Sequence, residues 1–156
     1  EPGRYVDTPA GRVQRTREGL ARLSHADFDD AALLFQGPEL RFAGTFRGRE
    51  VHLHGPVPRP AKLDSPGAQY LDADQIAWPL TLRGWEPGDR MNPLGMKGKK
   101  KLKDIFTDEK FSPLAKARAL VLADANGVIA LSDFRIAHRV RVRPETQRIL
   151  QFVTST

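Results

Sequence analysis

The segment GDRMNPLGMKGKKKLKDIF, residues 88–106 of this 156-residue sequence, carries the signals that decide the fold around it. Leu102, Ile105 and Phe106 are spaced i, i+3, i+4, which predicts a helix over residues 99–110 whose apolar face docks on the domain. Glycines and prolines between Pro87 and Gly98 predict an irregular loop before this helix. The segment also holds five lysines within seven positions: Lys97, Lys99, Lys100, Lys101 and Lys103.

Two interpretations of these lysines differ in what they predict. On a helical wheel, Lys99, Lys103 and Lys110 form a stripe beside the apolar face. Gly95 and Gly98 would leave backbone N–H groups exposed at the helix N-terminus, where the dipole favours a phosphate. Three arginines add guanidinium donors suited to phosphate: Arg83, Arg90 and Arg118. The segment then predicts a site that follows a nucleic-acid backbone. The alternative is a solvated face whose charges only keep the chain soluble.

The distribution of charge favours the first interpretation. The net charge is +6, but residues 1–82 carry 10 Lys/Arg against 11 Asp/Glu. Residues 83–118 carry 10 against 5, and residues 119–156 carry 5 against 3. A basic excess confined to one part of a folded domain is typical of a surface for a polyanion, and nucleic acid is the natural candidate.

Composition excludes several other classes of protein. The sequence has no cysteine, and therefore no disulfide, thiolate metal site or thiol nucleophile, which fits a reducing compartment; we expect a cytoplasmic location. No stretch approaches the roughly 18–20 consecutive apolar residues of a membrane span, so we expect no membrane role. The chain opens at Glu1 without a signal-peptide pattern, and we expect it to be a piece of a longer protein.

The sequence pattern in the rest of the chain predicts mostly short strands separated by Gly and Pro. Strands are predicted at GRVQRT, LARLS, ELRFAG, REVHLHGPV, YLDADQIAWPLTLR, ALVLAD, VIAL, FRIAHRVRVR and RILQFVT. Asn126-Gly127 predicts a tight hairpin turn, and Ser112-Pro113 predicts the cap of a second short helix. GPVPRPAKLDSPG predicts a loop. Periodicity leaves ADFDDAALLF open between a helical turn and a strand.

These elements predict an α+β fold dominated by β-structure. Small antiparallel sheets would form a sandwich or a partly open, barrel-like layer, with one or two short helices packed on a face. Residues 1–66 form the β-rich first half and residues 67–156 the basic module, and together we expect them to make one compact domain.

Signatures of catalysis are missing or incomplete. The sequence contains no GxxxxGK[ST], GxGxxG, HExxH or GxSxG. His52 and His54 share one strand face but lack a third ligand, and a partly exposed strand face is the commoner reason for this pattern. We therefore predict no catalytic residue and no metal site.

Several other polar residues have expected structural or auxiliary roles. Asp72 and Asp74 are predicted to cap a turn. Asp89 and Asp104 are predicted to orient the nearby cations or cap turns. Alternation in IAHRVRVR predicts a surface strand whose arginines extend the basic patch on one face: Arg139, Arg141 and Arg143.

Residues 82–118, LRGWEPGDRMNPLGMKGKKKLKDIFTDEKFSPLAKAR, resemble the C-terminal region of bacterial tRNA(Ile)-lysidine synthetases. The ordered pattern runs from Arg83-x-x-x-Pro-Gly-Asp-Arg through Pro93-Leu-Gly-Met-x-Gly to Lys100-Lys-Leu-Lys-Asp, and then to Pro113 and Arg118. YLDADQIAWPL before it and the hairpin with FRI after it extend the resemblance from residue 70 to about 150. The sequence departs from the family at Ala130 and Asp133, where tryptophan and glycine are usual, and at Trp85, which replaces a basic residue.

This resemblance implies a function shared between two parts of a protein. Such enzymes use ATP to attach lysine to the wobble cytidine of an isoleucine tRNA with a CAU anticodon. Their catalytic N-terminal PP-loop domain, marked by Ser-Gly-Gly-x-Asp-Ser, has no counterpart here. ATP and Mg²⁺ would belong to that domain, and no cofactor is expected in this chain. Alone, the chain would be inert, while the parent protein would be an ATP-dependent C–N ligase.

The expected role of the chain is to hold the tRNA body for the catalytic domain. The residues expected to bind RNA are Arg83, Arg90, Lys97, Lys99, Lys100, Lys101, Lys103, Lys110, Arg118 and Arg135. Expected partners are the isoleucine tRNA, the catalytic domain of the same chain and, in a homodimer, a second copy. The alternative is an interaction or dimerisation module that makes no direct RNA contact.

Overall fold

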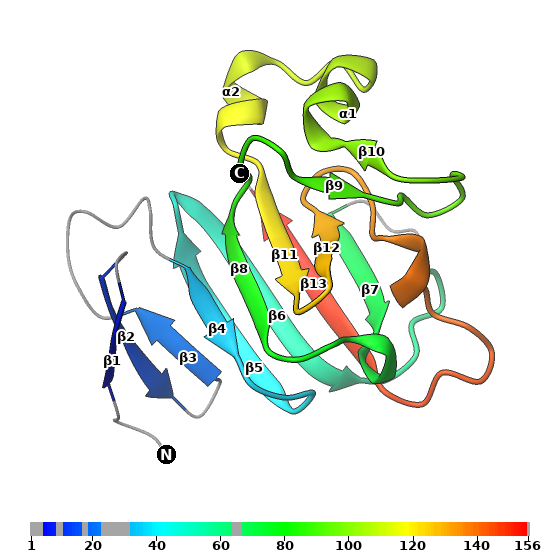
Figure 1. The fold of residues 1–156 in the computed structure, drawn as a ribbon. Helices are drawn as coiled ribbons and strands as arrows, with labels where there is room; N and C mark the ends of the chain where they lie inside the picture. Colours follow the sequence, from blue (N-terminus) through cyan, green and yellow to red (C-terminus); the bar gives the residue numbers. More distant parts are fainter. Residues whose placement is uncertain (1–4, 9–10, 17–18, 23–31, 64–66, 156) are drawn as a thin grey trace.

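The structure is a computed structural model that describes residues 5–8, 11–16, 19–22, 32–63 and 67–155. Two four-stranded antiparallel sheets lie face to face and form a sandwich (Figure 1). The first sheet has the order β12 (Gly127–Leu131), β11 (Leu120–Asp124), β8 (Leu80–Gly84), β4 (Leu33–Phe35). The second has the order β5 (Leu40–Phe46), β6 (Arg49–Val57), β13 (Ile149–Ser155), β7 (Ala68–Asp72). The predicted β-dominated α+β fold is confirmed.

A further antiparallel sheet comprises β1 (Tyr5–Thr8), β2 (Gly11–Thr16) and β3 (Gly19–Arg22). The two large sheets combine segments from both sides of the expected 66/67 boundary, because β4 pairs with β8 and β6 pairs with β13. Residues 33–35 of ADFDDAALLF are the strand β4, whereas residues 23–31 lie outside the described part of the chain. The predicted loop after β6 begins three residues later than expected, since β6 continues through Val57.

The core lies between the two sheets and follows from the alternation of the strands. In β6, Val51 and Leu53 are fully buried while His52 between them is exposed. Phe152 of β13 lies opposite Leu53 and is also buried. Strand β11 is buried at all five positions. Such near-continuous burial explains why ALVLAD reads as an apolar run without clear alternation.

A cap of short elements covers one end of the sandwich (Figure 1). It consists of β9 (Arg90–Met91), β10 (Lys100–Lys101), α1 (Leu102–Asp108) and α2 (Pro113–Ala117). The predicted apolar anchor of the cap is confirmed, because Leu102, Ile105 and Phe106 are at most 2% exposed. Rings extend the anchor: Phe106 lies 4.9 Å from Trp85 and 5.0 Å from Phe111, centroid to centroid.

The first helix is shorter than predicted, which corrects the lysine stripe. Lys99 precedes the strand β10, and the helix begins only at Leu102. Lys110 has a φ of 57° and lies beyond the helix end. Lys99, Lys103 and Lys110 therefore do not share one helical face. The second helix is as predicted, with the Ser112 hydroxyl accepting a hydrogen bond from the Ala115 N–H at 3.1 Å.

The hairpin and the segment after it differ from the prediction in detail. Strands β11 and β12 form the expected hairpin, but Ala125 and Asn126 make the turn, and Gly127 follows with a φ of 126°. The strand predicted across residues 134–143 is wrong, because His138–Val140 form a 3-10 turn closed by a bond from the Val140 N–H to the Ala137 carbonyl. The arginines of this segment consequently share no strand face.

Asp72 and Asp74 cap a turn, as predicted. The Asp72 side chain accepts a hydrogen bond from the Asp74 N–H at 2.9 Å at the start of the 3-10 turn Ala73–Gln75. Asp74 also pairs with the Arg148 guanidinium at 2.7 Å.

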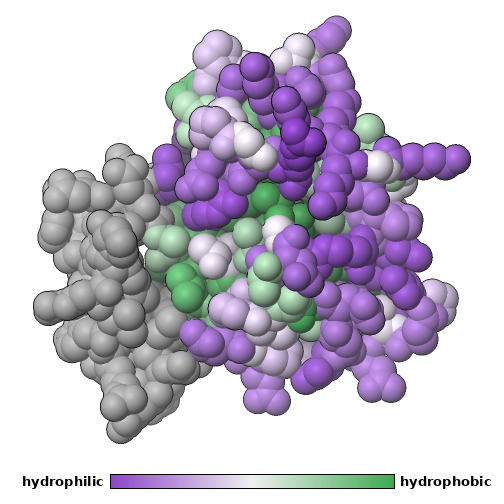
Figure 2. All heavy atoms as spheres, viewed as in Figure 1, coloured by the Kyte–Doolittle hydropathy of each residue, from purple (hydrophilic) through white to green (hydrophobic). Residues whose placement is uncertain are grey.

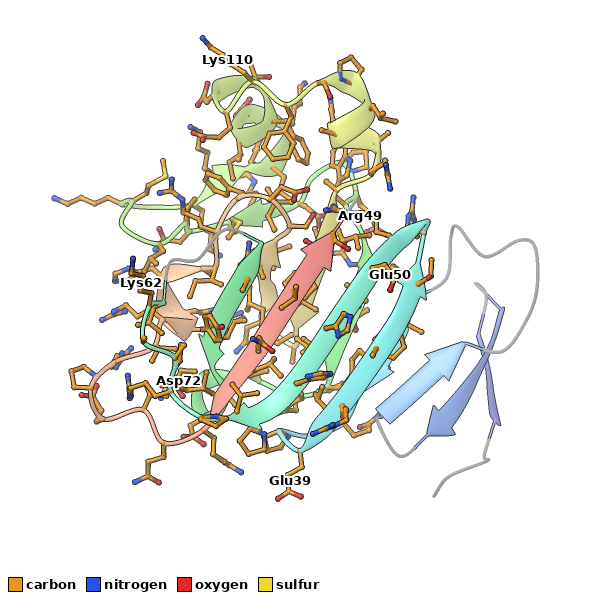
Figure 3. All side chains as sticks on the ribbon, turned by 180° about the vertical axis from the view of Figure 1, so that it is seen from behind. Glu39, Arg49, Glu50, Lys62, Asp72 and Lys110 are labelled. Carbon is orange, nitrogen blue, oxygen red and sulfur yellow. The ribbon has the colours of Figure 1, made fainter. Side chains whose placement is uncertain are left out.

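A buried arginine ties the two sheets together beneath the cap. Arg49 at the start of β6 is 2% exposed, and Figure 3 shows it at the cap end of the second sheet. Its guanidinium donates to the Ser132 hydroxyl at 3.1 Å and to the carbonyls of Arg118 and Ser155, and it pairs with the Asp133 carboxylate at 2.9 Å. Asp133 has a φ of 62°, where glycine is favoured, so its ion pair offsets backbone strain.

Asp124 fixes the other end of the first sheet. Its buried carboxylate accepts hydrogen bonds from the backbone N–H groups of Ala77 and Asn126, each at 2.9 Å. Both terminal nitrogens of Arg139 donate to it at 2.8 and 2.6 Å. Burial acts to raise the pKa of this carboxyl, but these hydrogen bonds outweigh it and hold the pKa below the ordinary value of 3.8.

Replacing Asp124 by Asn is expected to lower the free energy of unfolding at pH 7 by about 2 kcal/mol, because a buried charged pair loses one partner. A lowered folded-state pKa gives stability that is fully present above 3.8 and is lost as the pH falls through the folded-state value. Urea unfolding at pH 7, 5, 4 and 3 should therefore show that the free energies of unfolding of the unaltered chain and of Asp124→Asn become more similar as the pH falls. A difference of constant size would contradict this; the exposed Asp104→Asn serves as the control.

Candidate nucleic-acid interface

The cap is framed by an ion pair at the end of β8. Arg83 donates to both carboxylate oxygens of Asp89, at 2.9 and 3.0 Å, and Asp89 also accepts from the Glu86 N–H at 2.7 Å. Burial acts to lower the pKa of the Arg83 guanidinium, but the hydrogen bond and charge of Asp89 prevail and raise its pKa above the ordinary value. The Asp89 carbonyl accepts from the Leu102 N–H at 3.0 Å, which ties this turn to the start of α1.

Two cations face outward from the strand pair that follows. In β9 and β10, Arg90 lies directly opposite Lys101, and Met91 lies opposite Lys100. Directly opposite residues project to the same face of an antiparallel pair. Met91 is 2% exposed, so its face is turned inward, and Arg90 and Lys101 stand together on the exposed face. Like charges placed opposite each other repel, so Arg90 and Lys101 concentrate positive charge on this exposed face.

The loop between β9 and β10 is held in place by backbone bonds and by one amide. The Leu94 N–H donates to the Ile136 carbonyl at 2.9 Å, and Gly95 and Gly98 have φ values of 80° and 76°. The Asn92 amide, with its nitrogen turned toward the loop, donates to the carbonyls of Met96 and Gly98 at 2.8 Å. Sequence reasoning missed Asn92, although an asparagine just before two glycine turns is a recognisable signal.

The structure divides the ten predicted RNA-binding residues into two groups. Four side chains have partners within the chain: Arg83 pairs with Asp89, Lys100 with Asp108, Arg118 donates to the Gly48 carbonyl, and Arg135 donates to the Leu94 carbonyl. Six have no hydrogen-bond or ion-pair partner among the described residues, and we name them the unpaired cations: Arg90, Lys97, Lys99, Lys101, Lys103 and Lys110. All six are exposed.

The unpaired cations gather on the cap. Most residues visible over the cap in Figure 2 are hydrophilic, and Figure 3 shows Lys110 pointing away from the sheets. The sequence predicts a phosphate site at the start of α1, and part of that helix start is already bonded within the chain. Its Leu102 N–H already donates to Asp89, and Asp104 lies in its first turn. Asp104 makes no side-chain hydrogen bond or ion pair with the described residues, so of the two predicted orienting acids only Asp89 acts in this way.

Other candidate sites lie away from the cap. His52 and His54 stand 5.7 Å apart, ring to ring, on the outer face of β6. Burial, Arg41 and His52 lower the pKa of His54. Within the described part of the chain, no three His, Asp or Glu side chains are placed to hold a metal ion. None of the described helices is long and apolar enough to cross a bilayer.

Comparisons with known proteins identify the family that the C-terminal half of the chain resembles. Residues 80–152 match the family model "TilS substrate C-terminal domain". The chain is 43% identical over 81 residues to a tRNA(Ile)-lysidine synthase of Parabacteroides distasonis, covering 52% of this chain and 18% of the relative. It is 30% identical over 152 residues to a tRNA(Ile)-lysidine synthase of Bacteroides thetaiotaomicron, covering 96% of this chain and 32% of the relative. The chain thus spans about a third or less of these relatives.

A solved structure extends the comparison to the fold. The crystal structure of a TilS C-terminal domain superposes with a TM-score of 0.62 at 22% identity, over 81% of this chain and 98% of that one. At this identity the likeness concerns the fold alone.

Proposed function

Residues 80–152 belong to the TilS substrate C-terminal domain family, and on this premise we propose that the chain binds the tRNA on which a tRNA(Ile)-lysidine synthase acts. In this proposal the chain holds an isoleucine tRNA with a CAU anticodon. A separate PP-loop catalytic domain ligates lysine to the wobble cytidine of that tRNA with ATP and Mg²⁺. The ATP and the metal are assigned to that domain, so the contribution of this chain is to bind and orient the substrate.

One observation carries the proposal: Arg90 and Lys101 stand opposite each other on an exposed strand pair, with no acidic partner among the described residues. A phosphate between them would turn their mutual repulsion into attraction to a shared anion. The neighbouring unpaired cations are spread over the same cap, so successive phosphates along a backbone can be contacted. Duplex RNA hides its base edges in a deep groove, and the contacts of the cap would therefore read shape and backbone.

Binding through phosphates predicts a strong dependence on salt. With about five phosphates neutralised, a plot of log K against log[salt] should have a slope of roughly −4, with an affinity in the micromolar range or weaker. Anisotropy titrations of a labelled tRNA(Ile) transcript with the chain at 50, 100 and 200 mM KCl measure this slope. An affinity that ignores salt, or an absence of binding at 50 mM KCl, would refute the proposal. A salt-insensitive dimer seen by light scattering would instead favour the interaction module.

A further inference from the structure

A pocket of about 600 Å³ lies beside the edge strand β7, facing the turn that follows β12. Its lining includes Gln69 of β7, Phe134 and Arg135 of the turn, and Arg141, with Leu63 and Leu94 at the rim. The volume is in the range of pockets that hold small ligands. None of the roles described above for the cap uses this pocket.

The walls of the pocket suit a flat aromatic group that carries a negative charge. Leu63 and Leu94 are 42% and 37% exposed, although most large apolar side chains of the described residues are buried. The Arg135 guanidinium lies 4.5 Å from the centre of the Phe134 ring. A nucleobase stacks on either of these planes, and Arg135 and Arg141 supply positive charge for its phosphate.

Gln69 adds a specific requirement. Its amide nitrogen donates to the Leu131 carbonyl at 2.9 Å, whereas its side-chain oxygen is buried and accepts no hydrogen bond from the described residues. A buried acceptor without a partner is costly. Gln69 lines the pocket, and in this proposal a small shift of its amide lets the oxygen accept from an N–H group at the edge of the ligand. Amino and ring N–H groups on the edge of a base are such donors.

The pocket is joined to the cap by one residue. Leu94 belongs to the loop between β9 and β10, it lines the pocket, and its carbonyl accepts the hydrogen bond from Arg135 at 3.1 Å. An RNA strand whose backbone follows the loop between β9 and β10 would therefore reach the pocket at Leu94. Charge on the loop and an apolar slot beside it together indicate a nucleic acid with at least one base free of pairing.

We propose that this pocket takes one unpaired nucleotide of an RNA whose duplex part lies on the cap. The inference rests on the proposed function, because the cap must first hold the duplex. It adds that the chain distinguishes a duplex with a single-stranded end or bulge from a fully paired one.

The test compares two RNA probes of identical duplex. One is a 12-base-pair hairpin with a blunt end, and the other carries four additional unpaired nucleotides at its 3′ end. The chain is expected to bind the extended hairpin about tenfold more tightly, within the range that stacking of one base gives. Phe134→Leu, which keeps an apolar side chain, and Gln69→Met, which removes the acceptor, should each bring the ratio close to one without changing the affinity for the blunt hairpin.

Lys101→Gln is the matched control, because it should weaken both probes by the same factor and leave the tenfold ratio intact. A ratio of one in the unaltered chain, or a ratio that survives both pocket variants, would overturn the inference while leaving the proposed function standing. Failure of both probes to bind at 50 mM KCl would instead refute the proposed function. If free AMP or CMP binds as tightly as the extended hairpin, the pocket is a small-molecule site. If the chain self-associates and Phe134→Leu abolishes the association, the pocket binds a second copy of the chain. Either result overturns the inference.

Discussion

Replacing Arg90 and Lys101 together by Gln is expected to weaken binding of the chain to tRNA(Ile) about 50-fold at 0.1 M KCl. Each phosphate contact contributes close to 0.9 to the slope of log K against log[salt], which at this concentration is about a factor of eight in affinity. The two residues face each other on the exposed side of β9 and β10, so both contacts are lost together. The slope should also fall by about two, which the same anisotropy titrations measure.

The control removes two cationic side chains that already have a partner within the chain. Lys100→Gln with Arg118→Gln changes the net charge equally, but Lys100 pairs with Asp108 and Arg118 donates to the Gly48 carbonyl. This variant should lose less than about fivefold in affinity, since both side chains are held by partners within the chain and contribute only screened, longer-range attraction. Equal losses in both variants would mean that net charge, and not the arrangement of the cap, governs binding. Relief of repulsion should leave the Arg90/Lys101 variant as stable as the unaltered chain or slightly more so.

Arg49→Met is expected to lower the free energy of unfolding by about 3 kcal/mol. The substitution keeps an apolar stem of similar length but leaves the carbonyls of Arg118 and Ser155 without the Arg49 donor. The Ser132 hydroxyl keeps only the hydrogen bond from the Leu120 N–H. Asp133 also loses its ion pair while keeping a φ of 62°. The loss is at the lower end of the range for buried ion pairs because the Asp133 side chain is 43% exposed and stays hydrated.

Urea unfolding should show this loss as a lower midpoint with an unchanged m-value. Arg41→Met on the neighbouring strand β5 is the matched control, because Arg41 is exposed and its replacement should change stability by less than about 0.5 kcal/mol. Arg49→Lys should fall between the two, since it keeps the charge without the planar fork of donors. Equal stability of Arg49→Met and Arg41→Met would show that the buried guanidinium does not hold the sheets together.

The local elements of the fold could be predicted because their causes are local. The spacing of Leu102, Ile105 and Phe106 predicts the docked helix, and Ser112-Pro113 predicts the start of the next one. Tertiary contacts moved the boundaries: β10 takes up Lys100 and Lys101 by pairing with β9, which shortens the helix expected from residue 99. The strand predicted at residues 134–143 is wrong: the backbone turns at His138–Val140, where Arg139 pairs with the buried Asp124, a contact that the local alternation does not reveal.

The candidate site could be predicted as a region but not in its parts. The sequence places ten cations in or near residues 83–118, and nothing local separates Lys100 from Lys101. Their difference arises from the strand pair, which turns one toward Asp108 and the other toward Arg90. The buried Arg49 could not be recognised at all, because its partners lie 69 to 106 residues away in the sequence. Asn92, by contrast, has a local signal, because it precedes two glycines with positive φ.

The position of β13 between β6 and β7 also determines how the chain reaches this fold. Val51 of β6 pairs with Thr154 of β13, and about 100 residues of chain lie between them. Closing this long loop costs conformational entropy before the pairing contributes any stabilising contact. Strands β6 and β7 do not pair with each other, and both are hydrogen-bonded to β13, which lies between them. The domain should therefore fold on the millisecond-to-second timescale of proteins with non-local pairing, with the β5–β6 and β11–β12 hairpins forming early and the second sheet closing last.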